Sequence, residues 1–288
     1  METPEIKVAK FPTLKPIANA IISAKYYAGL SSGQAGIYRK EDGSLVTDTD
    51  SRVQDYLASV LAGVYEGQGL SFVMEEKDTE NAAAYPFVER AEVTVYLDPL
   101  DGTSSYVKGT GNWAISVGIR SDHSALGIIQ PAKGFMLIGH QGEDGNNIYT
   151  WRNGRIVEIG PTTLHTDQWR VAAHYNHQSI ETLRRIYSIL KGSPVVDPRS
   201  FGDAPQPGSL AADITGLVTG KYNLVVNGGC YPWDIAAAQT IIASGGHKIM
   251  DWEGNEINLA GLNDPRQMLR IVAGSPENIT RFYDQVYG

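Results

Sequence analysis

The sequence contains a single cysteine, Cys230, in 288 residues. One thiol cannot form an internal disulfide, and it cannot supply a four-thiolate zinc site. We expect Cys230 to be part of the core or of a pocket wall.

Long hydrophobic runs are also absent. No window of about 18 apolar residues occurs, so the sequence predicts no membrane-spanning helix. Residues 1–14 lack the uninterrupted apolar stretch of a secretory signal. We therefore expect a cytoplasmic location and no membrane partner.

Basic residues are too few to balance the acidic ones. Lys and Arg total 24 and Asp and Glu total 32, which gives a formal net charge of -8. Such a chain has no electrostatic footprint for a nucleic acid polymer or an anionic membrane surface. If the protein handles a phosphate, a bound metal cation is the obvious means of attracting it.

The composition that remains is that of an ordinary globular protein, with 42% hydrophobic and 19% charged residues. At about 100–200 residues per domain, the length allows one large domain or two ordinary ones. Strands in succession dominate the first part of the chain, and strands alternate with helices after about residue 160. We expect an α+β subdomain over residues 1–160 and an α/β subdomain over residues 161–288.

Apolar residues at helical spacing predict helices, and short apolar runs between turns predict strands. The predicted helices are a stretch that follows Thr49 and residues 17–30, 179–190, 210–218, 235–244 and 280–286. The predicted strands are residues 70–74, 93–97, 113–120, 125–130, 134–138, 147–151, 170–173, 195–196, 222–226 and 247–251. A glycine-bearing loop is expected over residues 31–43, and a hairpin turn at Asn153 and Gly154.

The most informative segment is residues 93–103, in which a predicted strand runs into a turn with two carboxylates. Proline and glycine in this turn allow the side chains of Asp98 and Asp101 to face one point at the strand's end. Two carboxylates with the carbonyl group of Leu100 between them make a hard-cation site of the magnesium kind.

The backbone amides that follow the second carboxylate belong to Gly102, Thr103 and Ser104. Amides at a turn or helix start can bind a phosphate group. The simpler alternative for the whole segment is an ordinary Asp-Pro turn with solvated carboxylates.

Acidic side chains occur at three further places. Glu75 and Glu76 end the apolar run at residues 70–74, and alone such a pair is most simply a solvated loop. Asp234 begins an alanine-rich helix and Asp50 precedes another predicted helix. A carboxylate in that position commonly caps the helix, so each residue alone favours a structural role.

Together these segments resemble the inositol monophosphatase superfamily of magnesium-dependent, lithium-sensitive phosphatases. That group includes inositol monophosphatases, 3′(2′),5′-bisphosphate nucleotidases, histidinol-phosphate phosphatases and fructose bisphosphatases. The matching elements are residues 42–50 (DGSLVTDTD), 75–76 (EE), 98–103 (DPLDGT), 233–237 (WDIAA) and 245–246 (GG). Their order and spacing agree over most of the chain, which outweighs the loop and cap interpretations. The resemblance implies a layered α-β-α-β-α sandwich of the sugar-phosphatase type, with the site between two halves, and commonly a homodimer.

The resemblance also implies a cluster of two to three Mg²⁺ ions. The implied ligands of the first ion are Glu75, Asp98 and the carbonyl oxygen of Leu100. Those of the second are Asp98, Asp101 and Asp234, and Glu75 would reach a third ion through water. Most of the metal site would thus lie in residues 1–160, while the rest of the chain supplies Asp234 and substrate contacts.

Other residues receive roles from the same resemblance. Asp50 and the hydroxyl group of Thr103 resemble the pair that orients and deprotonates the attacking water. Glu76 is expected to support the cluster or Thr103 from behind. The expected phosphate and substrate contacts are Gly102, Thr103, Ser104, Gly208, Ser209 and Asn227.

The sequence departs from the family pattern around the site. Met74 stands where many members have a glycine, and Ser104 and Ser105 replace the residues that often follow the Asp-Gly-Thr element. Asn227 stands where inositol-cleaving members have a glutamate that binds ring hydroxyls. These differences leave the metal ligands in place and concern the substrate.

The leading hypothesis is a phosphomonoesterase acting on a small phosphorylated metabolite such as an inositol monophosphate. The second is a nucleotidase acting on 3′-phosphoadenosine 5′-phosphate, for which Lys108 and Lys221 are isolated candidates to bind a second phosphate. Another small-metabolite phosphatase, such as a histidinol-phosphate phosphatase, and a non-catalytic family member are further alternatives. His174 and His177 have a spacing that suits a zinc ion, but no third ligand is close in the sequence.

Overall fold

The computed structural model describes residues 13–77, 79, 82–160, 169–174, 186, 195–196 and 208–288. Its helices are α1 (Leu14–Ser31), α2 (Asp48–Val64), α3 (Thr103–Val107), α5 (Leu210–Val218), α6 (Pro232–Ser244) and α7 (Pro276–Tyr287). Short 3₁₀ helices occur at Ala82–Ala84 and Leu259–Gly261.

Two sheets form the framework of the described residues. The 7-stranded sheet has the order β3-β4-β5-β6-β7-β8-β9, and only its β3–β4 pair is parallel. Its strands are β3 (Leu70–Met74), β4 (Val93–Asp101), β5 (Ala114–Arg120), β6 (Ala125–Pro131), β7 (Leu137–Gly142), β8 (Gly145–Arg152) and β9 (Arg155–Glu158). The 5-stranded sheet has the order β11-β10-β12-β14-β13. Its strands are β10 (Arg170–His174), β11 (Val195–Val196), β12 (Leu224–Cys230), β13 (Lys248–Asp251) and β14 (Leu269–Gly274).

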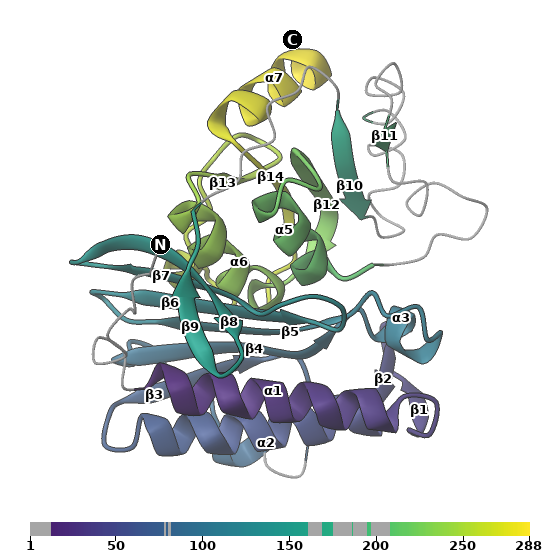
Figure 1. Ribbon diagram of the computed structural model, residues 1–288, viewed down its shortest axis with the longest axis vertical. Coiled ribbons are helices and arrows are strands. Elements are labelled where there is room, and N and C mark those ends of the chain that lie inside the picture. Colours follow the sequence, from purple (N-terminus) through teal and green to yellow (C-terminus); the bar gives the residue numbers. More distant parts are fainter. Residues whose placement is uncertain are drawn as a thin grey trace.

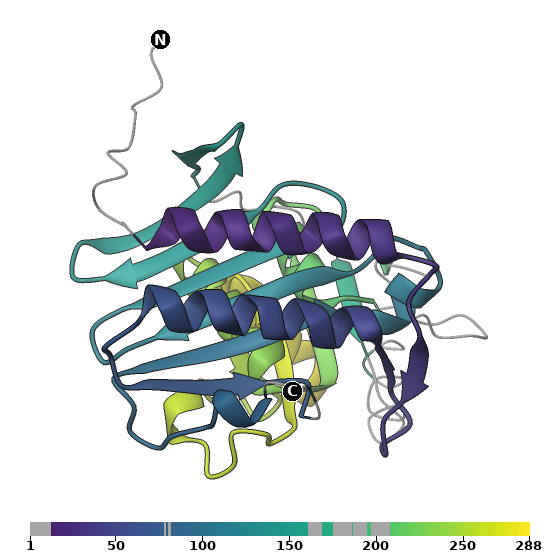
Figure 2. The same cartoon turned by 90° about the horizontal axis from the view of Figure 1, so that it is seen from below.

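Helices and sheets alternate in layers (Figure 1). The helices α1 and α2 run side by side over one face of the 7-stranded sheet (Figure 2), and their apolar side chains, such as Ile21 and Leu57, form a core with it. The helices α5 and α6 lie between the two sheets, and Ile235 belongs to that central core. The helix α7 covers the outer face of the 5-stranded sheet through Phe282. The order α-β-α-β-α confirms the layered sandwich that the sequence predicts.

A row of glycines brings α6 close to the 7-stranded sheet. Gly118, Gly127 and Gly139 are register partners on β5, β6 and β7. A Cβ atom on Gly118 would lie 2.7 Å from the Cβ of Ala236, and one on Gly139 would lie 2.5 Å from the Cα of Ile241. A Cβ on Gly127 would meet the carbonyl oxygen of Ala237. Only glycine permits this approach, which fixes the height of α6 above the sheet.

Most predicted elements occur in the structure, with some differences. The segment predicted as a loop over residues 31–43 contains β1 (Ile37–Arg39), which pairs with β2 (Leu45–Thr47) in a separate hairpin. The strand β14 was not predicted, because its short apolar run lacks clear alternation. The turn at Asn153 and Gly154 is confirmed, with β9 as its second strand. The helix predicted over residues 179–190 lies outside the described residues apart from Ile186.

Candidate metal centre

The strand β4 places two carboxylates together through a bulge. Asp98 pairs with Ser116 and Asp101 pairs with Ala114, so β4 has one residue more than β5 over this stretch. In a regular strand, side chains three residues apart point to opposite faces. The extra residue removes this alternation, so both side chains turn to one side. The amide of Leu100 donates to Oδ1 of Asp98 at 2.9 Å and fixes the orientation of that carboxylate.

The helix α6 brings a third carboxylate to the same point. Asp234 lies in its first turn, and its Oδ2 accepts from the amide of Tyr231 at 2.6 Å. Ligand oxygens of Asp98, Asp101 and Asp234 all lie within 4.8 Å of one another. Asp234 is therefore both a helix cap and a member of the cluster, because a carboxylate has two oxygens.

The helix α5 supports the second carboxylate of β4. Oδ2 of Asp101 accepts from the hydroxyl of Ser209 at 2.7 Å and from the amide of Ala211 at 2.6 Å. The same Ser209 hydroxyl accepts from the amide of Ala212 and caps α5. Gly102 follows Asp101 with a φ of 88°, and a Cβ there would lie 2.8 Å from the carbonyl oxygen of Asn112. The turn thus requires glycine by conformation and by space.

These carboxylates are held near one another at an electrostatic cost. Burial raises the pKa of Asp98 well above its ordinary value, and the charges of Glu75, Asp101 and Asp234 raise it further. Burial likewise raises the pKa of Asp234, with Asp101 as the next cause. Burial also raises the pKa of Asp101 to about 6, although its bonds from α5 oppose this. A cation at this point would relieve the repulsion.

Glu75 and Glu76 follow β3 and face an ammonium group. Nζ of Lys40, on the β1–β2 hairpin, lies 2.7 Å from Oε1 of Glu75 and 2.8 Å from Oε1 of Glu76. Burial opposes the charge on Lys40, but the two glutamates outweigh it and raise the pKa of the ammonium. Burial and then Glu75 raise the pKa of Glu76 to about 8, against the effect of Lys40. The backbone amide of Glu76 donates to Oε1 of Gln54 at 2.9 Å, and Nε2 of Gln54 donates to the carbonyl oxygen of Glu76 at 2.7 Å.

Asp50 and Thr103 form the pair that the resemblance implies. The hydroxyl of Thr103 donates to Oδ1 of Asp50 at 2.9 Å and lies 3.1 Å from the carbonyl oxygen of Leu100. Oδ2 of Asp50 accepts from the amide and the hydroxyl of Thr47, which makes the capping box of α2. Burial raises the pKa of Asp50 to about 6, against the hydrogen bond from Thr47. Asp50 therefore serves as a cap and can also accept a proton near neutral pH.

The residues predicted to contact substrate occupy varied positions. Ser104 lies in α3, and Gly208 and Ser209 precede α5. A Cβ on Gly208 would lie 2.8 Å from Nδ2 of Asn112, so a larger residue there would have to displace that side chain. Asn227 lies on β12, is 5% exposed, and accepts a hydrogen bond from the amide of Gly229 at 2.7 Å. The single side-chain oxygen of Asn227 is thus already bonded within its own chain.

Several contacts near the site were not predicted. Nε2 of His174 lies 2.7 Å from Oδ2 of Asp213, and His174 is the register neighbour of Asn227. His177 lies outside the described residues, so the suggested zinc pair stays untested. Lys40 was missed because its partners are distant in sequence. Glycines within predicted strands were the available signal for the close approach of α6.

The other residues noted in the sequence have ordinary surroundings. Cys230 is buried, and its Sγ lies 3.6 Å from the carbonyl oxygen of Leu269. Nζ of Lys221 lies 4.7 Å from the centre of the Tyr222 ring. Lys108 follows α3 and its amide donates to the carbonyl of Ser104.

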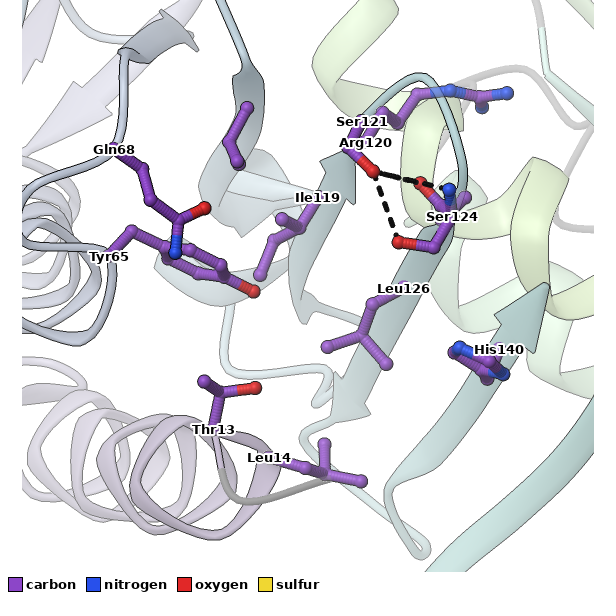
Figure 3. Close-up of a pocket in the computed structure, with 12 residues that line it drawn as sticks. Thr13, Leu14, Tyr65, Gln68, Ile119, Arg120, Ser121, Ser124, Leu126 and His140 are labelled. Carbon is purple, nitrogen blue, oxygen red and sulfur yellow. Dashed lines mark hydrogen bonds between the residues drawn. The ribbon is translucent and has the colours of Figure 1, made fainter. Parts of the chain in front are cut away.

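A separate pocket of about 180 Å³ lies near the start of α1 and the β5–β6 turn (Figure 3). Thr13, Tyr65, Arg120 and His140 are among its lining residues, and none of the lining residues is acidic. Val93, at the start of β4, also lines it, whereas Asp98 and Asp101 lie at the other end of that strand. The pocket is therefore distinct from the acidic cluster.

The residues of the acidic cluster fit a hard divalent cation. The clustered donors are carboxylate oxygens, which Mg²⁺ prefers, and the cluster contains neither thiolate nor imidazole. Each of the three clustered carboxylates has one oxygen bonded to a backbone amide, so its direction is fixed before any ion binds. Such pre-positioned oxygens are typical of a metal centre.

Comparison with known proteins agrees with this geometry. A model of the inositol monophosphatase family matches residues 7–286. Inositol monophosphatase 1 of Mus musculus is 27% identical over 220 residues, which span 75% of this chain and 74% of that protein.

Solved structures share the fold. The extragenic suppressor protein suhB from Bartonella henselae has a TM-score of 0.72 at 16% identity, covering 95% of this chain and 98% of that chain. An IMPase/NADP phosphatase complexed with Mg²⁺ and phosphate has a TM-score of 0.66 at 18% identity, covering 94% of each chain. Among the described residues, no helix combines the length and apolarity needed to cross a bilayer.

Proposed function

The chain belongs to the inositol monophosphatase family and is a phosphatase, and from this premise we propose that it is a Mg²⁺-dependent phosphomonoesterase of small hydroxylated phosphate esters. An inositol monophosphate is the first candidate substrate. The observation that carries the proposal is the cluster of Asp98, Asp101 and Asp234 beside the Asp50–Thr103 pair.

The residues that would hold Mg²⁺ are Glu75, Asp98, Asp101, Asp234 and the carbonyl group of Leu100. When bound, Mg²⁺ lowers the pKa of water and neutralises charge on the phosphate and the departing alkoxide. The protein's own contribution is orientation, because backbone amides fix the carboxylates and Ser209 and α5 fix Asp101. Lys40 lies against the same carboxylate of Glu75, so a cation held by Glu75 would compete with its ammonium group.

Asp50 and Thr103 supply the path for a proton. The Thr103 hydroxyl donates to Asp50, which leaves the threonine oxygen to accept a hydrogen bond from the attacking water. As the water oxygen forms its bond to phosphorus, its proton passes to Thr103 and the Thr103 proton passes to Asp50. The P–O bond to the alcohol breaks in line with this attack, and the alkoxide takes a proton from solvent. The amides of Gly102, Thr103 and Ser104 are the proposed phosphate contacts.

A panel of phosphate esters tests the proposal. Inositol 1-phosphate, 3′-phosphoadenosine 5′-phosphate, NADP, histidinol phosphate and an aryl phosphate would be compared by kcat/KM, with Mg²⁺ and with EDTA. We expect phosphate release with Mg²⁺ only, restored when Mg²⁺ is added back to the EDTA-treated protein. Lithium at millimolar concentration is expected to inhibit. If phosphate were released from none of these esters, the protein would instead be a non-catalytic family member.

A further inference from the structure

Arg266 connects two segments of the metal centre that come from distant parts of the chain. It lies in the loop between Leu259–Gly261 and β14. Its Nη2 donates to the carbonyl oxygen of Met74 at 2.9 Å, and its Nη1 lies 3.5 Å from that of Glu75. Its Cζ is 5.2 Å from the centre of the Trp233 ring. One guanidinium therefore contacts the segment of Glu75 and the residue that precedes Asp234.

The loop itself is shaped to present this side chain. Oδ1 of Asp264 accepts from the amide of Arg266 at 2.8 Å, and the carbonyl of Asp264 accepts from the amide of Gln267 at 3.0 Å. These bonds form a tight turn that directs Arg266 towards β3. Among the described strands, β3 is at the edge of its sheet, so the carbonyls on its outer side have no partner strand there.

Glu75 needs such support because it stands just beyond the end of an edge strand. The amide of Glu75 donates to the carbonyl of Leu97 at 3.2 Å, and Gln54 holds the following residue from the other side. Arg266 supplies the contact on the outer edge and ties it to Trp233. The Tyr231 ring stacks on Trp233 with centroids 4.8 Å apart, which stiffens the start of α6.

We propose that Arg266 is a positioning residue that sets the placement of Glu75 relative to Asp234 and thereby the affinity of the centre for Mg²⁺. This inference rests on the proposed function. Arginine is suited to the task because its planar fork bonds two acceptors while its face lies on an aromatic ring. A lysine would keep the positive charge near Glu75 but could not make the fork or the stack.

Isothermal titration calorimetry with Mg²⁺ alone, without substrate, tests the proposal on the full chain. The variants are Arg266→Ala and Arg266→Lys, and Arg270→Ala is the matched control. Arg270 also lies over a tryptophan, with its Cζ 5.4 Å from the centre of the Trp252 ring, and within the described part of the chain no hydrogen bond or ion pair joins it to the Glu75 segment. Melting temperatures in EDTA report on folding, and Arg266→Lys is the conservative variant if Arg266→Ala does not fold.

We expect both Arg266 variants to raise the Mg²⁺ dissociation constant by about tenfold or more, as losses of supporting contacts around metal ligands do. Their kcat at saturating Mg²⁺ should stay within about threefold of the wild type, since no reacting group is removed. Arg270→Ala should bind Mg²⁺ like the wild type. Wild-type affinity in Arg266→Lys would show that charge alone matters and would overturn the positioning role, as would equal losses in Arg270→Ala. A wild-type protein that binds no Mg²⁺ would overturn the proposed function as well.

Discussion

Asp50 uses its two carboxylate oxygens for different purposes. Oδ2 caps α2 through Thr47, and Oδ1 accepts from the Thr103 hydroxyl. Capping fixes the side chain, so the oxygen that faces Thr103 is positioned without further contacts. The two interpretations that the sequence leaves open, a cap or a base, are therefore compatible in one residue.

The pH dependence of activity follows from this residue. A base must be ionised to accept a proton, and burial raises the pKa of Asp50 to about 6. We expect kcat/KM to fall as the pH drops through about 6, measured from about pH 5 to pH 9. A flat pH profile across this range would remove Asp50 from the proton path.

Thr103→Val should lower kcat by about a hundredfold or more, whereas Thr103→Ser keeps the hydroxyl and most of the activity.

Asn227 is the residue on which the predicted substrate preference depends. Its side-chain oxygen is bonded to Gly229, and its other group is a donor, so it offers less to ring hydroxyls than a glutamate. We expect a relaxed enzyme whose kcat/KM values on inositol 1-phosphate and other small esters lie within about two decades. Asn227→Glu should shift the preference towards inositol 1-phosphate by about tenfold relative to a nucleotide substrate. An unchanged ratio would mean that this position does not select the substrate.

Asp98 and Asp101 could be proposed as metal ligands from their turn, whereas Glu75 and Asp234 could be proposed only because the motifs together resemble the family. Lys40 and Arg266 could not, since their roles depend on contacts with Glu75 across the fold. Nothing local distinguishes either from a solvated surface cation. The bulge that aligns Asp98 and Asp101 likewise depends on the pairing with β5.

At the scale of elements, the placement of Asp234 depends on how closely α6 approaches the sheet. Gly118, Gly127 and Gly139 form the surface on which α6 lies, and Asp234 is in its first turn. The helix was predictable from its alanine-rich sequence, but its depth was not. The depth is set by strands whose register cannot be deduced from the helix.

Gly127→Ala should displace α6. A Cβ there meets the carbonyl oxygen of Ala237, so we expect the free energy of unfolding to fall by about 1–3 kcal/mol and Mg²⁺ binding to weaken. Urea unfolding and calorimetry measure these effects. Gly63→Ala is the control, because it adds the same methyl group to α2 with no heavy atom within 4 Å. It should leave Mg²⁺ binding unchanged and add about 0.5–1 kcal/mol of stability. Equal behaviour of the two variants would contradict the packing account.

At the scale of the whole molecule, the acidic cluster brings together carboxylates from the 7-stranded and the 5-stranded sheets. Asp98 and Asp101 end β4 of the 7-stranded sheet, and Asp234 follows β12 of the 5-stranded sheet. The 7-stranded sheet ends at Glu158 and the 5-stranded sheet begins at Arg170. The division of the chain near residue 160 into two subdomains stays a prediction, as does a homodimer.

Stability and metal binding should be linked across the molecule. The raised pKa values of Asp98 and Asp234 mean that the folded protein favours their protonated forms. The two protonated carboxyl groups contribute fully to the stability of the fold below the ordinary carboxyl pKa. This contribution is lost as the pH rises through their raised pKa values. In EDTA, Asp98→Asn should therefore melt at a higher temperature than the wild type at pH 8, and by less at pH 5.

Magnesium should reverse this difference. A ligand at a concentration of about a hundred times its dissociation constant stabilises the folded state by about 2.7 kcal/mol. We expect the wild-type melting temperature to rise by about 5 °C with Mg²⁺, and that of Asp98→Asn to rise much less. Asp122→Asn, at an exposed position in the β5–β6 turn, is the control and should behave like the wild type. A wild-type melting temperature that Mg²⁺ does not change would argue against the metal centre.

The most direct test of the central claim is Mg²⁺-dependent phosphate release from inositol 1-phosphate by the wild type and by Asp98→Asn. Asp98 is buried within the cluster and is the proposed ligand of two ions, so its loss should lower turnover by at least about a hundredfold. Asp122→Asn should retain full activity. An Asp98→Asn protein that keeps half of the wild-type rate at saturating Mg²⁺ would contradict the assignment of this cluster as the catalytic metal centre.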